Sequence, residues 1–275
     1  MESVAYLGPP YSFSHDLVVS EYPHANHVSC PSLHEVVESV AKGRTQRGVV
    51  PFYNTTRKSI EESQIELVTH REKVFVTDVK PLDVRHFLCG FGTVEQITEL
   101  RSKPVVYHQA SKWIEENLPI AKQVECPSTS AAVQSVAEER KPHIAAIGTH
   151  SASKGYGVPV LSREIQNKPN VTLFFVIQNQ KFDPQSMDYV LMCLINATTE
   201  DKAKIDAVVS SSGCSISTNW PVTLNQRSTA YFFEVNSQYS TLDLHAAVNK
   251  ILTETSKAFV CGGYKGKCIT RLIWV

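Results

Sequence analysis

The alternation of short apolar segments with helix-forming segments constrains the fold of this chain more than any other feature. Val4–Gly8, Arg47–Phe52 and His143–Ile147 have the length and character of buried strands, whereas Ser32–Lys42 and Ser128–Glu139 begin with capping serines and continue with helical periodicity. Short strands that alternate with helices are typical of a parallel sheet with helices on its faces. The sequence therefore predicts an α/β fold whose first part is a doubly wound sheet.

The other elements of this first part are predicted in the same way. Further strands are expected at Val74–Leu82, His86–Phe91, Pro104–Tyr107 and Val171–Gln178, and further helices at Ser14–Ser20, Thr93–Arg101 and Gln109–Asn117. Ser12 or Ser14 is expected to cap the first helix. Pro51 is expected to end its strand, because proline cannot donate to a ladder.

Such sheets bind ligands outside the carboxyl ends of their strands. The segments to inspect for a site are therefore Gly8–Ser14, Pro51–Ser59, Tyr107–Gln109 and Gly148–Tyr156.

A second pattern begins at Asp188. The predicted order is strand Tyr189–Ile195, helix Asp201–Ser211, strand Ser215–Leu224, strand Ser228–Val235, helix Leu242–Thr253 and strand Ala258–Gly262, with a further short strand at Thr270–Val275. The six-element order βαββαβ is that of ferredoxin-like domains. We therefore expect two domains, residues 1–183 and 184–275.

The charge and cysteine content exclude several classes of function. Lys+Arg and Asp+Glu both number 27, which argues against a nucleic-acid or anionic-membrane partner. The sequence shows no signal peptide and no apolar run that could span a membrane. The 7 cysteines form no C-x-x-C pair and the 10 histidines no metal-ligand spacing, so we expect a cytoplasmic protein with reduced thiols, no metal and no cofactor.

Six segments, in order along the chain, resemble the motifs of the prephenate dehydratase family. They are Tyr6–Ser14, Pro51–Lys58, Tyr107–Ala110, Ser128–Ala132, Ala145–Thr149 and Asn170–Phe174. The resemblance covers nearly the whole chain and implies a catalytic domain of two lobes, similar to periplasmic binding proteins, with the site in the cleft between them. It also implies a C-terminal ACT-like domain, a homodimer or homotetramer, and prephenate as the small-molecule substrate.

The resemblance places the family's polar site positions on individual residues. Thr172 and Asn54 are carried over as catalytic residues. Ser12, Thr55, Thr56, Ser102, Gln109, Phe174 and Arg57 are carried over as substrate-binding residues. Neutral side chains of this kind can hold carboxylates and a hydroxyl without supplying a general base. His15, His86 and His108 are candidates for a proton donor by position alone.

Three residues depart from the family's pattern. Tyr53 stands at the glutamate of the E-N-[ST] motif, Leu173 at the arginine of T-R-F, and Tyr11 at a glycine of the first motif. Leucine offers neither the charge nor the bidentate geometry of arginine, whose charged hydrogen bonds contribute about 1.5–3 kcal/mol each. This chain is thereby similar to the non-aromatising prephenate decarboxylases, an offshoot of the family that serves antibiotic and related amino-acid biosynthesis. Arg57 or Lys58 is a candidate to supply the missing charge.

Other functions remain open at this point. The chain is also compatible with a prephenate dehydratase that makes phenylpyruvate for phenylalanine biosynthesis, or with an inactive prephenate-binding sensor. Thr172 can equally be a packing residue of a strand, Asn54 a turn former, and Gln109 the start of a helix. In the ACT-like part, Asp201–Ala203 and Thr218–Pro221 keep only a proline of the family's G-A-L and E-S-R-P effector motifs, so phenylalanine binding is not expected.

Overall fold

The computed structural model describes residues 2–180, 186–237, 240–266 and 269, and divides into two compact units. The first unit contains Met1–Ala5, Leu33–Pro81 and Thr172–Val275, and the second contains Tyr6–Ser32 and Leu82–Val171. The predicted domain boundary at 183/184 and the predicted strand Thr270–Val275 lie outside the described residues.

The amino-terminal part of the first unit contains the antiparallel strand pair β3 (Arg47–Asn54) and β11 (Val171–Gln178), which carries Asn54 and Thr172. The other elements of this part are β1 (Ser3–Leu7), α2 (Leu33–Ala41), β4 (Lys58–Ser59), α3 (Glu61–Thr69) and β5 (Phe75–Asp83). β11 lies between β5 and β3 and is antiparallel to β3.

The prediction that β3 ends at Pro51 is wrong. β3 continues to Asn54, with Pro51 opposite Phe174, where the register between β3 and β11 shifts. Such irregularities accommodate a residue that has no N–H to donate. The continuation brings Asn54 opposite Thr172.

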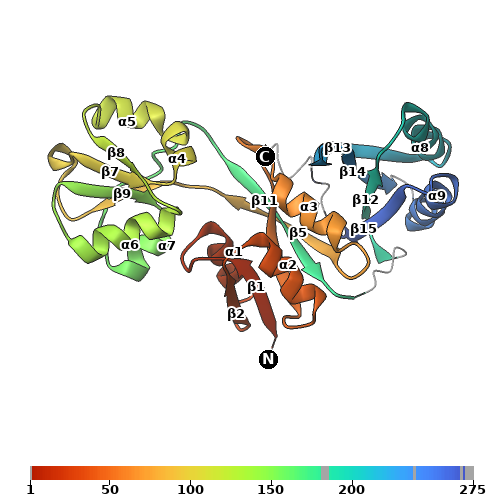
Figure 1. Ribbon diagram of the computed structural model, residues 1–275, viewed down its shortest axis with the longest axis horizontal. Helices are drawn as coiled ribbons and strands as arrows, with labels where there is room; N and C mark the ends of the chain where they lie inside the picture. Colours follow the sequence, from red (N-terminus) through yellow and green to blue (C-terminus); the bar gives the residue numbers. More distant parts are fainter. Residues whose placement is uncertain (1, 181–185, 238–239, 267–268, 270–275) are drawn as a thin grey trace. The chain divides into compact units, whose positions relative to one another are not determined.

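The carboxy-terminal part of the first unit has the predicted βαββαβ order. Its elements are β12 (Tyr189–Ile195), α8 (Thr199–Ser211), β13 (Cys214–Asn225), β14 (Ser228–Ser237), α9 (Thr241–Glu254) and β15 (Ala258–Tyr264). The sheet order is β13-β14-β12-β15, and its three strand pairs are antiparallel. Both helices pack on one face of this sheet (Figure 1), over a core that includes Val190, Met192, Ile205 and Val248.

The two parts of the first unit share a sheet and an aromatic cluster. β15 runs parallel to β5, and Gly262 lies so close to Val76 that a Cβ on the glycine would be 2.0 Å from the Val76 carbonyl oxygen. In the aromatic cluster, the Phe52 ring stacks on the Phe175 ring with 3.9 Å between ring centres. The Phe52 and Trp220 rings form an edge-to-face contact with 5.3 Å between ring centres. The ACT-like part therefore packs directly on the strand that carries Asn54.

The second unit contains a separate mixed sheet. The strands of this sheet are β6 (Phe87–Gly90), β7 (Glu99–Ser102), β8 (Lys122–Glu125), β9 (Ile144–Gly148) and β10 (Val160–Ser162). The unit also contains α1 (Phe13–Glu21), β2 (Asn26–Cys30), α4 (Pro104–Gln109), α5 (Ser111–Asn117), α6 (Thr129–Glu139) and α7 (His150–Tyr156). In the order β10-β6-β9-β7-β8, β7 is parallel to both neighbours, whereas β6 is antiparallel to both of its neighbours. The expectation of a parallel sheet in residues 1–183 is thus wrong, because β11 is antiparallel to β3 and β6 is antiparallel to both of its neighbours.

Two neighbouring elements of this unit also differ from prediction. The predicted helix Thr93–Arg101 is a short 3₁₀ turn, Val94–Gln96, followed by β7, and the predicted strand Pro104–Tyr107 is helix α4. Pro104 occupies the first turn of α4, where a missing N–H costs nothing. Leu100, by contrast, is completely buried in β7, between two parallel partners.

Among the described residues, no helix is long and apolar enough to cross a membrane. The same part of the chain holds no group of three or more side chains that could bind a metal ion.

Candidate functional site

The predicted site residues fall into one group in each unit. Asn54, Thr55, Thr56, Arg57, Thr172 and Phe174 belong to the first unit, and Ser12, Ser102 and Gln109 belong to the second.

Asn54 and Thr172 are joined by a buried side-chain hydrogen bond. Asn54 Nδ2 donates to Thr172 Oγ1 at 2.8 Å, across facing positions of β3 and β11. The other end of the amide is also engaged, because Asn54 Oδ1 accepts from the backbone N–H groups of Thr56 at 3.0 Å and Arg57 at 2.9 Å. Residues 118 positions apart are thereby fixed as one rigid polar unit.

The next pair along the same two strands has no such polar link. Leu173 lies opposite Tyr53 and is completely buried. The Tyr53 ring lies 6.1 Å from the Trp220 ring of β13, centre to centre. The arginine and glutamate positions of the family's motifs are therefore occupied by a buried aliphatic residue and an aromatic one.

The turn after Asn54 carries two exposed cationic residues. Arg57 and Lys58 are both exposed, and Lys58 has a left-handed backbone with φ of 68°. Neither cationic side chain forms an ion pair within the described residues. The cations stand beside the Asn54–Thr172 pair in sequence, and their role in binding stays a prediction.

Gln109 is held by a buried histidine. His86 Nε2 and Gln109 Oε1 are 2.8 Å apart, and the His86 ring meets the edge of the Phe13 ring at 5.8 Å. Burial lowers the pKa of His86 below its ordinary value, although the hydrogen bond to Gln109 opposes this shift. Of the three histidines predicted as proton donors, His86 is the one whose ring is hydrogen-bonded to the side chain of a predicted site residue within the described part of the chain. His108 is exposed, and His15 Nδ1 accepts from the Tyr11 N–H at 3.0 Å.

The other predicted binding residues already have structural partners. Ser102 is completely buried and donates to the Ile147 carbonyl at 2.9 Å. Ser12 caps α1, accepting from the His15 N–H at 3.3 Å, which confirms the predicted cap. Phe174 is 2% exposed. Substrate contacts of these three residues stay predictions.

Tyr11 occupies a backbone conformation that favours glycine. Its φ is 63°, and its carbonyl accepts from Thr149 Oγ1 at 2.8 Å. The Tyr11 ring covers Gly155 so closely that a Cβ on that glycine would be 2.3 Å from it. The motif glycine at position 11 was a signal for this positive φ, but the contact with Gly155, 144 positions away, had none in the sequence.

Comparisons with known proteins agree with the motifs. The sequence pattern of the family "Prephenate dehydratase" matches residues 4–182. A bifunctional chorismate mutase/prephenate dehydratase of Escherichia coli K12 is 30% identical over 204 residues, which are 71% of this chain and 52% of that protein. This chain spans about half the length of the curated relatives it matches.

Solved structures show the same fold over nearly the whole chain. The prephenate dehydratase of Staphylococcus aureus Mu50 has a TM-score of 0.75 at 23% identity, covering 95% of this chain and 99% of that one. GqqA, described as a novel type of quorum quenching acylase, has a TM-score of 0.84 at 17% identity, covering 98% and 100%. The predicted fold class is confirmed: a two-lobed catalytic domain like those of periplasmic binding proteins, followed by an ACT-like domain.

Proposed function

Because this chain belongs to the prephenate dehydratase family, we propose that it is a lyase that removes the ring carboxylate of prephenate and leaves the ring hydroxyl in place. The catalytic domain of this proposal is residues 1–183, and residues 184–275 form the ACT-like domain. The protein works without a cofactor, as a cytoplasmic homodimer or homotetramer, and its product serves specialised amino-acid or antibiotic biosynthesis.

The observation that carries the proposal is the burial of Leu173. At this position the family places an arginine, and here an aliphatic side chain with no exposed surface fills the space, opposite Tyr53 instead of a glutamate. A site that expels the hydroxyl as water must stabilise the charge that develops on the departing oxygen. Neither Leu173 nor its neighbour across the strands offers a charged donor for that purpose.

The polar pair beside Leu173 supports binding and decarboxylation. Asn54 and Thr172 are neutral, and their mutual hydrogen bond fixes both side chains before substrate arrives. Neutral groups can hold a carboxylate or hydroxyl of the substrate through hydrogen bonds. Decarboxylation itself requires no general base, since carbon dioxide leaves from an ionised carboxylate that has no proton to remove.

The bond changes of the two reactions differ in one step. In both, the bond between the quaternary ring carbon and its carboxylate breaks, carbon dioxide leaves, and the electron pair moves into the ring diene. In a dehydratase this pair expels hydroxide, which leaves as water, and the ring becomes aromatic. In the proposed reaction the electron pair instead takes up one proton from the solvent at a ring carbon, and the product is a dihydro-hydroxyphenylpyruvate that keeps the hydroxyl.

The product spectrum separates these reactions. Incubation with prephenate is expected to consume the substrate without the strong alkaline ultraviolet absorbance of phenylpyruvate. Appearance of that absorbance would identify a dehydratase, the activity in the name of the Escherichia coli relative. Prephenate that is bound but never consumed would instead identify a binding or sensor protein.

A further inference from the structure

The buried histidine of the second unit uses one ring nitrogen and leaves the other without a partner. His86 is 1% exposed. Its Nε2 lies 2.8 Å from Gln109 Oε1, whereas its buried Nδ1 has no hydrogen-bond partner in the described part of the chain. An orphaned polar atom in so buried a ring calls for a physical reason.

The geometry fixes the tautomer of this ring. An amide oxygen can only accept, so Nε2 carries the proton and Nδ1 carries a lone pair. The alternative, with a proton on Nδ1, would leave a buried N–H unsatisfied, which is rarer in proteins than an unsatisfied acceptor. Burial also lowers the pKa of His86 below its ordinary value, which favours the neutral form of the ring. The ring is thus a donor toward Gln109 and toward nothing else described.

This arrangement orients the Gln109 amide. With Oε1 committed to His86, the Nε2 end of the amide points the other way and donates to no group in the described ranges. Gln109 itself is partly exposed. Two amide N–H groups are therefore presented as donors, which suits an acceptor such as a carboxylate oxygen.

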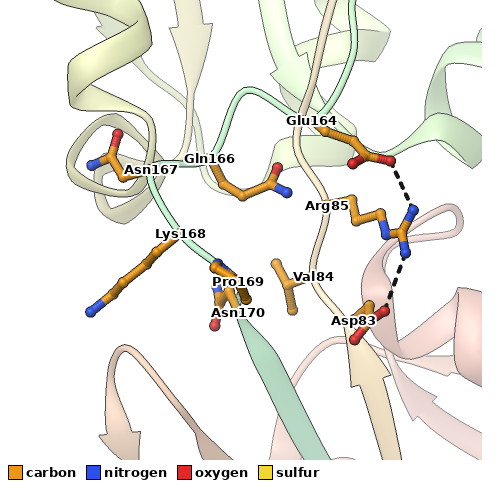
Figure 2. Close-up of a pocket in the computed structure, with 9 residues that line it drawn as sticks. All are labelled: Asp83, Val84, Arg85, Glu164, Gln166, Asn167, Lys168, Pro169 and Asn170. Atoms are coloured by element: carbon orange, nitrogen blue, oxygen red, sulfur yellow. Dashed lines mark hydrogen bonds and ion pairs between the residues drawn. The ribbon is translucent and has the colours of Figure 1, made fainter. Parts of the chain in front are cut away.

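Two consecutive residues, Gln166 and Asn167, are hydrogen-bonded to His86 and to Gln109, and we call them the Gln166–Asn167 bracket. Gln166 Oε1 accepts from the His86 backbone N–H at 3.0 Å, and the Asn167 N–H donates to the Gln109 carbonyl at 2.7 Å. Asn167 also donates from its side chain to the His108 carbonyl at 3.0 Å. Figure 2 shows Gln166 and Asn167 as neighbours on one segment, with the Gln166 side chain directed toward Val84 and Arg85, the residues that lead into His86, and the Asn167 side chain directed away from them.

We propose that His86 is a positioning residue, which holds the Gln109 amide so that its N–H groups donate to a carboxylate of the substrate. This inference rests on the proposed function, because it takes prephenate as the ligand. His86 touches no reacting atom in this account. Its effect passes through Gln109, and the Gln166–Asn167 bracket sets the distance between the two side chains.

Steady-state kinetics on prephenate test the inference through a double-mutant cycle. His86→Phe keeps an aromatic ring against Phe13 and removes the donor, so KM is expected to rise about tenfold with little change in kcat, as for lost uniform binding. His86→Gln, whose amide nitrogen reaches the place of Nε2, is expected to restore KM to within about twofold. When Gln109→Ala is already present, adding His86→Phe should raise KM for prephenate by less than about twofold further.

Two further variants keep the test decisive. His86→Asn places its amide at the position of Nδ1, where it cannot donate to Gln109, so it should raise KM as His86→Phe does. His86→Asn takes the place of His86→Phe in the test if His86→Phe does not fold. His143→Phe, at an exposed histidine of the same unit, is the control and should leave KM unchanged.

The outcomes separate the two claims. A wild-type protein that leaves prephenate unconsumed contradicts the proposed function itself. An active wild type with an unchanged KM in His86→Phe and His86→Asn overturns the positioning role alone. Effects of His86→Phe and Gln109→Ala that multiply in the double variant also overturn it, because they show that His86 does not act through Gln109.

Discussion

The two parts of the first unit treat the family's motif residues differently. In the catalytic part, Asn54 and Thr172 match the family's motifs and are joined by a hydrogen bond, whereas Tyr53 and Leu173 replace the motifs' glutamate and arginine. In the ACT-like part, the fold persists while the effector motif residues are replaced. Trp220 is 7% exposed there and packs on Phe52. One part therefore retains motif residues in a buried hydrogen-bonded pair, whereas the other retains the βαββαβ fold without the effector motif residues.

Restoring the family's arginine is expected to have the largest effect. Leu173→Arg would bury a charge opposite Tyr53, which offers no carboxylate, and should lower the free energy of unfolding by about 3–5 kcal/mol. Adding Tyr53→Glu should recover part of the loss. Urea denaturation measures the free energy of unfolding of the single and the double variant. An undiminished stability in Leu173→Arg would show that position 173 can hold a charged side chain without burying it.

The ACT-like part contains a buried acid whose ionisation should be visible in stability. Glu234 is completely buried, accepts from Ser217 Oγ and from the Ile269 N–H, and has its pKa raised by burial from 4.5 to about 7. The folded state therefore binds this proton more tightly than the unfolded state. The stabilisation is complete below pH 4.5 and is lost as the pH rises through about 7.

Glu234→Gln removes this dependence. Between pH 5 and pH 8 the wild type is expected to lose about 2.5 kcal/mol of unfolding free energy relative to the variant. Denaturation midpoints of the wild type and of Glu234→Gln, measured between pH 5 and pH 8, test this expectation. Parallel curves for wild type and variant would mean that the carboxyl titrates at its ordinary pKa.

Breaking the retained polar pair should cost less stability but more activity. Thr172→Val keeps the β-branched shape and leaves Asn54 Nδ2 without its acceptor, at a cost of about 1–3 kcal/mol. Turnover of prephenate should fall by about tenfold or more, since 1.4 kcal/mol in a barrier is a factor of ten. Thr77→Val, which loses a weaker bond of 3.4 Å to the Val176 carbonyl, is the control. Equal losses in both variants would contradict a special role for Thr172.

The exposed cation beside this pair is expected to have a smaller effect. If Arg57 compensates for the charge missing at Leu173, Arg57→Ala should raise KM for prephenate about two- to fivefold, in the range of exposed charge interactions. Arg227→Ala, in the exposed turn between β13 and β14, should leave KM unchanged. An unaltered KM in Arg57→Ala would remove Arg57 from the binding site.

The ACT-like framework is expected to show no effector response. Phenylalanine at millimolar concentration should leave the Tm unchanged, because the motif segment around Trp220 packs against the catalytic part instead. Differential scanning fluorimetry measures this, with prephenate as the positive control. A rise in Tm with phenylalanine would mean that an effector site persists in the ACT-like part.

The sequence predicted those elements whose local pattern agrees with their environment. All six elements of the ACT-like part and the capped helices α1 and α6 are present. The edge strands β2 and β8 were missed, since they show no apolar run, and β2 has one buried residue while β8 has none. Helix α4 was predicted as a strand, because Val105 and Val106 outweighed the helix-starting Pro104.

The site was predictable only through the family's motifs. No local pattern links Asn54 to Thr172, or His86 to Gln109, because these contacts depend on the register of distant strands and on the packing of α4. Sequence reasoning named His86 by position alone. The Gln166–Asn167 bracket that holds it had no motif to reveal it.

Proton NMR of the complete reaction with prephenate distinguishes the proposed decarboxylase from a dehydratase. Olefinic ring signals and a retained carbinol proton are expected in a product that has lost one carboxylate. Aromatic signals of phenylpyruvate, formed at the same rate as prephenate disappears, would contradict the proposed reaction and assign this chain to the dehydratases.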